Sequence, residues 1–203
     1  MRAVTMRLLA VASLFAVTSC DSATAPAPTA SSNSASKLLI GPTTVKVVTR
    51  NTPLAAPVSA STTVGLLGGQ IYMPSVGLKV VIPALAVKSG TKITVTAVAG
   101  NQVAYEFQPH GIRFLTPLIV TQNLSNTSAA NSSGLLNTLV SGGIFAGYFE
   151  SLSDLNQGAG TALVSELLGV ALNLSTKSAT FSVFHFSGYL VATGDNASLS
   201  DSQ

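Results

Sequence analysis

The feature that most constrains the fold is the stretch 68–118, a run of short apolar segments cut at regular intervals by glycine and proline. Leu78–Ile82 alternates and stops at Pro83, and Lys92–Val98 alternates cleanly between two faces. A period of two residues is that of a β-strand with one buried face, and glycine and proline form turns or end such strands. This stretch therefore predicts a compact antiparallel β domain.

Similar segments occur on both sides of it. The further strands that we expect are Val45–Arg50 (ended by Pro53 and Pro57), Val64–Leu67, Gln70–Met73, Val103–Phe107, Leu118–Thr121, Ile144–Phe149, Ala179–Val183, His185–Tyr189 and Leu190–Thr193. The nearly continuous apolar run Leu163–Leu174 is expected to form two strands broken at Gly169, and Gly134–Val140 a helical turn. About ten short strands separated by turn signals predict an all-β fold, a single antiparallel β-sandwich over residues 38–194 with a polar tail at 195–203.

The composition agrees with an exported β domain. Val, Ile, Leu and Ala are mixed with Ser, Thr, Gly and Asn, and only 8% of the residues are charged. If Arg2 and Arg7 are removed with an N-terminal segment, the 10 basic residues fall to 8 against 7 acidic ones, a net charge of +1. A nucleic acid is therefore not expected as a partner.

The N-terminus has the pattern of an export and anchoring signal. Residues 1–19 combine two arginines with the apolar stretch Leu8–Val17 and small residues, which is typical of a secretory signal peptide. The only cysteine, Cys20, follows Val-Thr-Ser, and this resembles the lipobox of bacterial lipoproteins, in which the cysteine is acylated and becomes the new N-terminus. The resemblance implies a lipid bilayer as partner and a location on the periplasmic or cell-surface side of the cell envelope. Residues 20–37, rich in Ala, Pro, Ser and Thr, are expected to be a disordered tether.

Three local patterns together resemble one known β-sandwich family. They are Gly68-Gly69 with Gly77, Leu78, Val80, Ile82, Pro83 and Ala86; Phe107, Pro109, Gly111, Phe114, Pro117 and Leu118; and the stretch His185-Phe186-Ser187-Gly188-Tyr189. In this they are similar to the ZU-five domain of ankyrins, netrin receptors and tight-junction scaffolds. The chain departs from the family at Ala84-Leu85, where the family has Pro-Gly. The resemblance implies a scaffolding or interaction module, with binding more than catalysis as its role. No cofactor is expected.

The sharpest candidate for chemistry is His185-Phe186-Ser187. Residues two apart on a strand share a face, so His185 and Ser187 are expected side by side. The histidine would take the proton of the serine hydroxyl, which would then attack the Phe186 carbonyl. The tripeptide resembles that of self-cleaving ZU-five domains, which cut between Phe and Ser. Either Glu150 or Glu166 would orient the histidine. The alternative, which we favour, is a core strand in which His185 makes local hydrogen bonds.

Other candidate sites are weaker. His110 is expected in an exposed turn, and a metal site built on His110 and His185 would lack nearby carboxylates or thiolates, so no metal is expected. No G-x-S-x-G sequence points to a serine hydrolase. Six aromatic residues form either a sugar-binding platform or, as we favour, part of the core: Tyr72, Tyr105, Tyr148, Tyr189, Phe145 and Phe149.

The sequence therefore predicts a lipid-anchored bacterial protein whose β-sandwich is a non-enzymatic binding or structural module for an unidentified envelope protein or glycan. Self-cleavage between Phe186 and Ser187 is one alternative. A carbohydrate-binding surface is the other.

Overall fold

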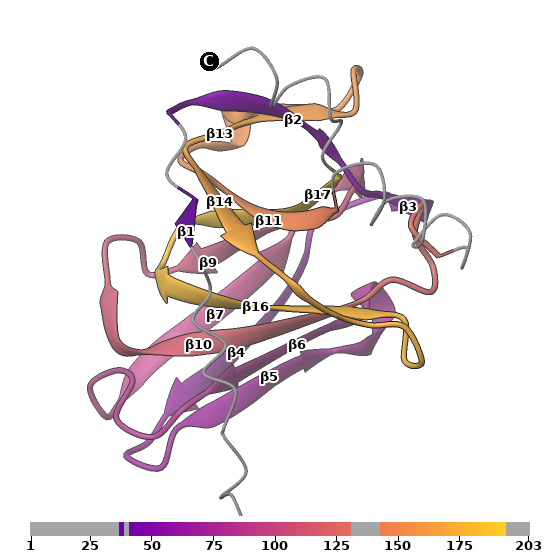
Figure 1. Ribbon diagram of the computed structural model, residues 1–203. Helices are drawn as coiled ribbons and strands as arrows, with labels where there is room; N and C mark the ends of the chain where they lie inside the picture. The colour runs from indigo at the N-terminus through magenta and orange to yellow at the C-terminus, as the bar shows by residue number, and fades with distance from the viewer. Residues whose placement is uncertain (1–36, 39–40, 131–142, 194–203) are drawn as a thin grey trace, which may run out of the picture. The chain divides into compact units, whose positions relative to one another are not determined.

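The computed structural model describes residues 37–38, 41–130 and 143–193 (Figure 1). The expected signal peptide, Cys20 and nearly all of the tether, the helical turn Gly134–Val140 and the polar tail lie outside these residues. The described part consists of β-strands and two short 3-10 helices, η1 (Pro74–Val76) and η2 (Leu152–Asp154). It contains no helix with the length and apolar character needed to cross a membrane. The predicted all-β fold is confirmed.

The described strands form three antiparallel sheets. In the five-stranded sheet the order is β15 (Ala171–Asn173), β16 (Ser178–His185), β10 (Arg113–Asn123), β6 (Leu78–Ile82) and β5 (Gly69–Met73). In the ten-stranded sheet the path is β1 (Lys37–Leu38), β14 (Glu166–Gly169), β11 (Ile144–Phe149), β17 (Gly188–Thr193), β2 (Thr43–Val47), β13 (Thr161–Val164) and β12 (Leu155–Asn156). A branch from β17 adds β9 (Ala104–Gln108), β7 (Thr91–Ala97) and β4 (Val58–Val64), and β3 (Thr49–Leu54) pairs with β8 (Gly100–Gln102).

The main core fills the space between the five-stranded sheet and the facing part of the ten-stranded sheet. On β6, Leu78, Val80 and Ile82 are buried, while Lys79 and Val81 between them are exposed. Ile93 and its alternate neighbours on β7 are buried in the same cluster. Two sheets that each bury one face against the other form a β-sandwich, as the alternating pattern predicts.

Strand β17 lies between two cores. Tyr189 and Val191 belong to the main core, and Leu190 and Ala192 belong to a second, smaller core. The ten-stranded sheet curls around this smaller core, because β13 continues through Ser165 into β14 at the other end of the strand order (Figure 1). A strand buried on both faces loses the polar alternation of an exposed sheet, which explains the uniformly apolar sequence of β17.

Several expected boundaries were wrong. The strand expected at Val45–Arg50 divides at Val48 into β2 and β3, and Pro53 lies inside β3 instead of ending it. The strand expected at Val64–Leu67 does not form, because a tight turn closed by a bridge between Gly65 and Gly68 follows β4.

Two other segments are correct only in part. The break expected at Gly169 occurs at the end of β14, but a second break at Ser165 gives three strands in place of two. The expected strand Leu118–Thr121 is the second half of β10, which continues through Pro117 with a shift of register.

Candidate functional site

The tripeptide His185-Phe186-Ser187 forms the crossover between the two main sheets. Strand β16 ends at His185, Phe186 and Ser187 form a bend, and β17 begins at Gly188. The expectation that His185 and Ser187 share one face of a continuous strand, His185–Tyr189, is therefore wrong. Alternation holds only while the backbone stays extended, and here the chain turns from one sheet into the other.

The crossover is anchored by the core. The Phe186 side chain is 2% exposed and packs edge-on against Phe114, with ring centroids 4.6 Å apart, and stacks on Phe107 at 6.3 Å. The Phe186 N–H donates to the Ile112 carbonyl at 2.9 Å, and the Phe107 N–H donates to the Ser187 carbonyl at 3.0 Å. Hydrogen bonds on both sides therefore hold the Phe186–Ser187 peptide in place.

His185 is surrounded by two tyrosines and a carboxylate. Its Nδ1 lies 3.3 Å from the Tyr189 hydroxyl, which itself donates to the His185 carbonyl at 2.9 Å. Because the hydroxyl has a single hydrogen, both contacts are satisfied when Nδ1 carries a proton and donates to the Tyr189 oxygen. The Nε2 atom lies 3.8 Å from Glu166 Oε2, and the ring meets Tyr148 edge-on at 4.7 Å.

Of the two candidate orienting residues, Glu166 is thus the one beside His185. Glu150 instead accepts a hydrogen bond from the Ser165 hydroxyl at 3.2 Å. Burial raises the pKa of Tyr189 well above its ordinary value, and the nearby Glu166 and Tyr148 raise it further. The phenol of Tyr189 therefore stays neutral while it holds the histidine.

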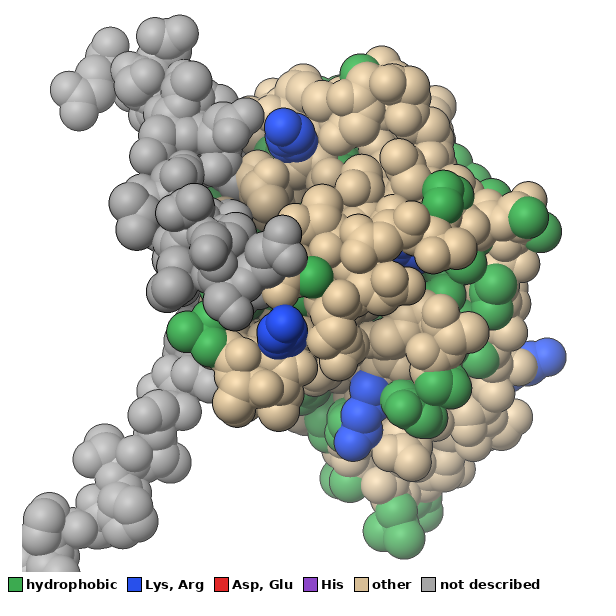
Figure 2. Space-filling view, turned by 90° about the vertical axis from the view of Figure 1, so that its right-hand side faces the viewer, with side chains coloured by type: hydrophobic (Ala, Val, Ile, Leu, Met, Phe, Trp, Pro, Cys, Tyr) green, Lys and Arg blue, Asp and Glu red, His purple; other side chains and the backbone are tan. Residues whose placement is uncertain are grey.

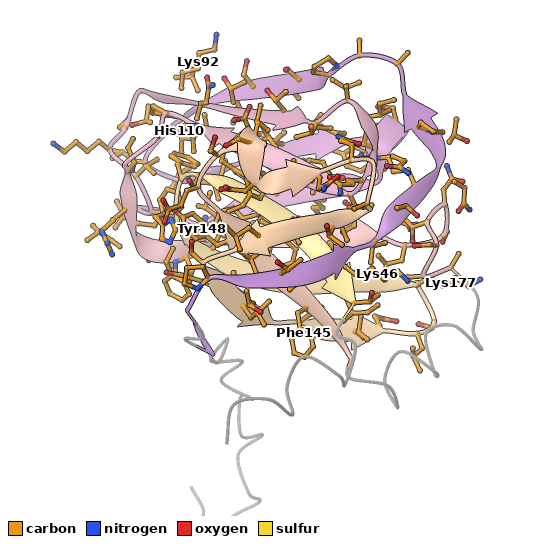
Figure 3. The ribbon with its side chains drawn as sticks, turned by 90° about the horizontal axis from the view of Figure 1, so that it is seen from above. Lys46, Lys92, His110, Phe145, Tyr148 and Lys177 are labelled. Atoms are coloured by element: carbon orange, nitrogen blue, oxygen red, sulfur yellow. The ribbon has the colours of Figure 1, made fainter. Side chains whose placement is uncertain are left out.

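Ser187 is brought to the same site by Tyr148. The Ser187 side chain, only 6% exposed, donates to the Tyr148 hydroxyl at 3.4 Å. These residues line a hollow of about 490 Å³, and its rim includes His110 in an exposed turn, as predicted. Figure 3 shows His110 and Tyr148 on the same side of the molecule. We call this region the crossover site.

The expectation that no carboxylate lies near the histidines was wrong, because Glu166 lies beside His185. In the described residues, however, His, Cys, Asp and Glu side chains do not form a group of three that could hold a metal ion.

The six aromatic residues do not form one platform. Tyr105, Tyr189 and Phe149 are buried in the core, as favoured from the sequence. Tyr72 is 65% exposed on β5, and Phe145 and Tyr148 are half-buried on β11. The exposed member, Tyr72, lies at a different hollow.

That second hollow, which we call the Arg50 hollow, has a volume of about 740 Å³. It lies on the face of β3, η1 and the β15–β16 turn, and Figure 2 shows this side with Lys and Arg side chains and without Asp or Glu in view. Its lining is mostly hydroxyl and amide side chains, including Thr52, Ser75, Thr121, Gln122, Asn123, Asn126, Thr127, Thr176 and Ser178, together with Tyr72, Lys79 and Arg50.

Sequence reasoning missed Arg50. Alternation gave no signal for it, because in the expected strand Val45–Arg50 it shares a face with Lys46 and Val48, and its burial is seen only in the structure.

No model of a known protein family matches this chain. No curated protein matches it either. The resemblance to the ZU-five domain thus stays a prediction that rests on the residues quoted for it.

Proposed function

We propose that this chain is a bacterial lipoprotein, anchored in the cell envelope through an acylated Cys20, whose β-sandwich is a non-enzymatic binding module. The sequence around Cys20 supports the anchoring, and the Ala/Pro/Ser/Thr-rich residues up to Ser36 are suited to hold a folded domain away from a bilayer.

The observation that carries the binding role is the Arg50 hollow. Its volume is within the range of about 300–1,000 Å³ that is usual for ligand sites. The lining residues offer many hydroxyl and amide groups and one exposed aromatic ring, that of Tyr72. None of these described lining residues is His, Cys, Asp or Glu, and the two that belong to the other general acid and base types, Tyr72 and Lys79, are exposed. Such a lining favours recognition of a polar ligand over catalysis on it.

Metabolic labelling tests the anchor. The full chain, produced in a bacterium fed a clickable palmitate analogue, is expected to carry the label in the membrane fraction. The Cys20→Ser variant is expected to lose both the label and the membrane location. An unlabelled wild-type chain would overturn the proposal of lipid anchoring.

An array of envelope glycans and peptides tests the binding role. We expect the purified chain to bind a subset of the spots, and Tyr72→Ala to weaken that binding because it removes the exposed ring in the hollow. Phe184→Ala removes a ring that is 45% exposed and is not among the lining residues of the hollow, so it is a matched control. An array without binding, or equal loss in both variants, argues against the role.

The second candidate function is self-cleavage before Ser187, favoured by the 3.8 Å distance between His185 Nε2 and Glu166 Oε2. In this reaction the Ser187 hydroxyl would attack the Phe186 carbonyl carbon and lose its proton to His185 Nδ1. For this, Nδ1 would have to be unprotonated and released from Tyr189, with the ring proton on Nε2 facing Glu166. The C–N bond would break as the serine nitrogen takes that proton, leaving an ester. Water would then split the ester into a Phe186 carboxylate and a Ser187 hydroxyl.

Intact mass distinguishes the two functions. Self-cleavage predicts two fragments whose masses sum to the chain plus one water, and a single species for Ser187→Ala. Glu166→Gln would slow the cleavage, while Glu150→Gln, whose partner is Ser165, would not. An uncut wild-type chain excludes this candidate.

A further inference from the structure

The guanidinium of Arg50 is buried and only partly hydrogen-bonded. The side chain is 8% exposed, and its Nη1 donates to the Gln102 carbonyl. No described residue accepts a hydrogen bond from its Nε or its Nη2. A buried cation with two unused donors is costly unless something accepts from them.

The neighbouring polar groups are largely bonded to one another, and the one that also interacts with Arg50 is the neutral hydroxyl of Tyr105. The Tyr105 hydroxyl donates to Gln122 Oε1 and lies 3.2 Å from the Val76 carbonyl, and Gln122 Nε2 donates to the same carbonyl at 3.0 Å. The Tyr105 ring lies below the guanidinium, with its centroid 5.5 Å from Cζ. This closed network orients Arg50 but supplies no anion.

The side chain of Gln102 does not accept a hydrogen bond from Nε or Nη2 of Arg50. Its Oε1 is also buried without a partner in the described part of the chain. Its Nε2 donates to the carbonyls of Asn156 and Thr161, both at 3.1 Å, and these two bonds fix the orientation of the amide. Among the described lining residues there is no Asp or Glu, so none of them supplies a counter-charge to Arg50.

We infer that the Arg50 hollow binds a carboxylate-bearing saccharide, with Arg50 as the residue that receives the carboxylate. This deepens the binding role proposed above and rests on it. Nε and Nη2 lie on one edge of the guanidinium, where two parallel N–H bonds match the two oxygens of a carboxylate. Exposed Lys79 at the same hollow adds positive charge.

The other lining residues favour a sugar as the molecule that bears the carboxylate. The hydroxyl and amide groups of Thr52, Ser75 and Asn126 suit the hydroxyls of a sugar ring, and exposed Tyr72 offers a flat face for its C–H side. Nε and Nη2 are themselves shielded from solvent, so a lining side chain must move as the carboxylate enters.

Calorimetry with the full chain in detergent tests this inference. The probes are tri-galacturonate, its methyl ester and a tripeptide with a free C-terminus. The wild type is expected to bind the acid, and to bind the ester at least about tenfold more weakly, since the ester cannot pair with the guanidinium. Arg50→Met should reproduce that loss for the acid. Arg113→Met, at an exposed arginine of the crossover site, should stay within about twofold of the wild type.

Each other result overturns the inference. If the acid and the ester bind with equal affinity, Arg50 does not pair with the carboxylate. This comparison uses only the wild-type chain, so it does not depend on whether a variant folds. Tighter binding of the tripeptide assigns the hollow to peptide carboxylates. If uncharged glycans bind in a Tyr72-dependent way while tri-galacturonate does not, the inference fails and the binding role stands; if nothing binds, both fail.

Discussion

The crossover site and the Arg50 hollow both bury ionisable side chains, but they differ in how those side chains are satisfied. In the crossover site, His185 lies between Tyr189 and Glu166, so its polar atoms have partners within the fold. In the Arg50 hollow, two nitrogens of the guanidinium have no acceptor in the described residues. Side chains whose hydrogen-bonding groups all find partners within the fold, as at the crossover site, need no role beyond stabilising the connection between the two sheets. A buried charge with two donors that have no acceptor in the described residues is the observation behind the proposed ligand.

Replacement of Phe186 should give the largest effect, because it tests whether the crossover site is a structural joint. Phe186→Ala removes a ring that contacts Phe114 and Phe107, and we expect a loss of about 3–5 kcal/mol in the free energy of unfolding. Phe184→Ala, two residues earlier and 45% exposed, should cost about 1 kcal/mol or less. Urea denaturation of both variants measures the difference. Equal losses would contradict the view of Phe186 as the anchor.

Gly188 is the second test of the joint. A Cβ at this position would overlap the ring of Phe149, which is fully buried, so Gly188→Ala should destabilise the fold by about 1–3 kcal/mol. The matched control is Gly158→Ala, where the nearest atom, Asn156 Oδ1, is 3.6 Å from the added Cβ. Equal shifts of the melting temperature in both variants would show that the crossover accommodates a larger side chain at position 188.

These two positions also show what the sequence could predict. Local alternation placed β6, β7 and β11 correctly, because each has one buried face or a clear turn on either side. Alternation could not reveal the bend at Phe186–Ser187, since that bend depends on pairing with Ile112 and Phe107, residues more than seventy positions away. The same reason hid the neighbours of Arg50, which come from η1, β9 and β10.

Each of the two regions contains a buried tyrosine, and the ionisation of these tyrosines makes the stability of the fold depend on pH at high pH. Burial raises the pKa of Tyr189 and of Tyr105, while the charge of Arg50 offsets part of the rise for Tyr105. Above about pH 10 the unfolded chain loses these protons and the folded chain keeps them, so stability falls as pH rises, by up to about 1.4 kcal/mol per pH unit for each group.

Tyr189→Phe and Tyr105→Phe should therefore each flatten the alkaline fall in stability. Phe184→Leu, at an exposed ring that carries no ionisable group, is the control and should leave the slope unchanged. Urea midpoints between pH 9 and 11 measure the slopes. An unchanged slope in either variant would mean that its tyrosine ionises as readily in the folded chain as in the unfolded chain.

The smallest expected effect on stability is that of Arg50→Met. The change removes the hydrogen bond to the Gln102 carbonyl and the contact with the Tyr105 ring, but it also removes a buried charge with two unpaired donors. Because these terms oppose each other, the free energy of unfolding should change by about 1 kcal/mol or less in either direction. Urea denaturation without any saccharide measures this change, with Arg113→Met as the exposed control.

A loss as large as that of Phe186→Ala would make Arg50 a structural residue and would erase the distinction between the two regions. A small change would mean that the fold does not need this arginine, which is the condition under which a ligand can be the reason for its charge.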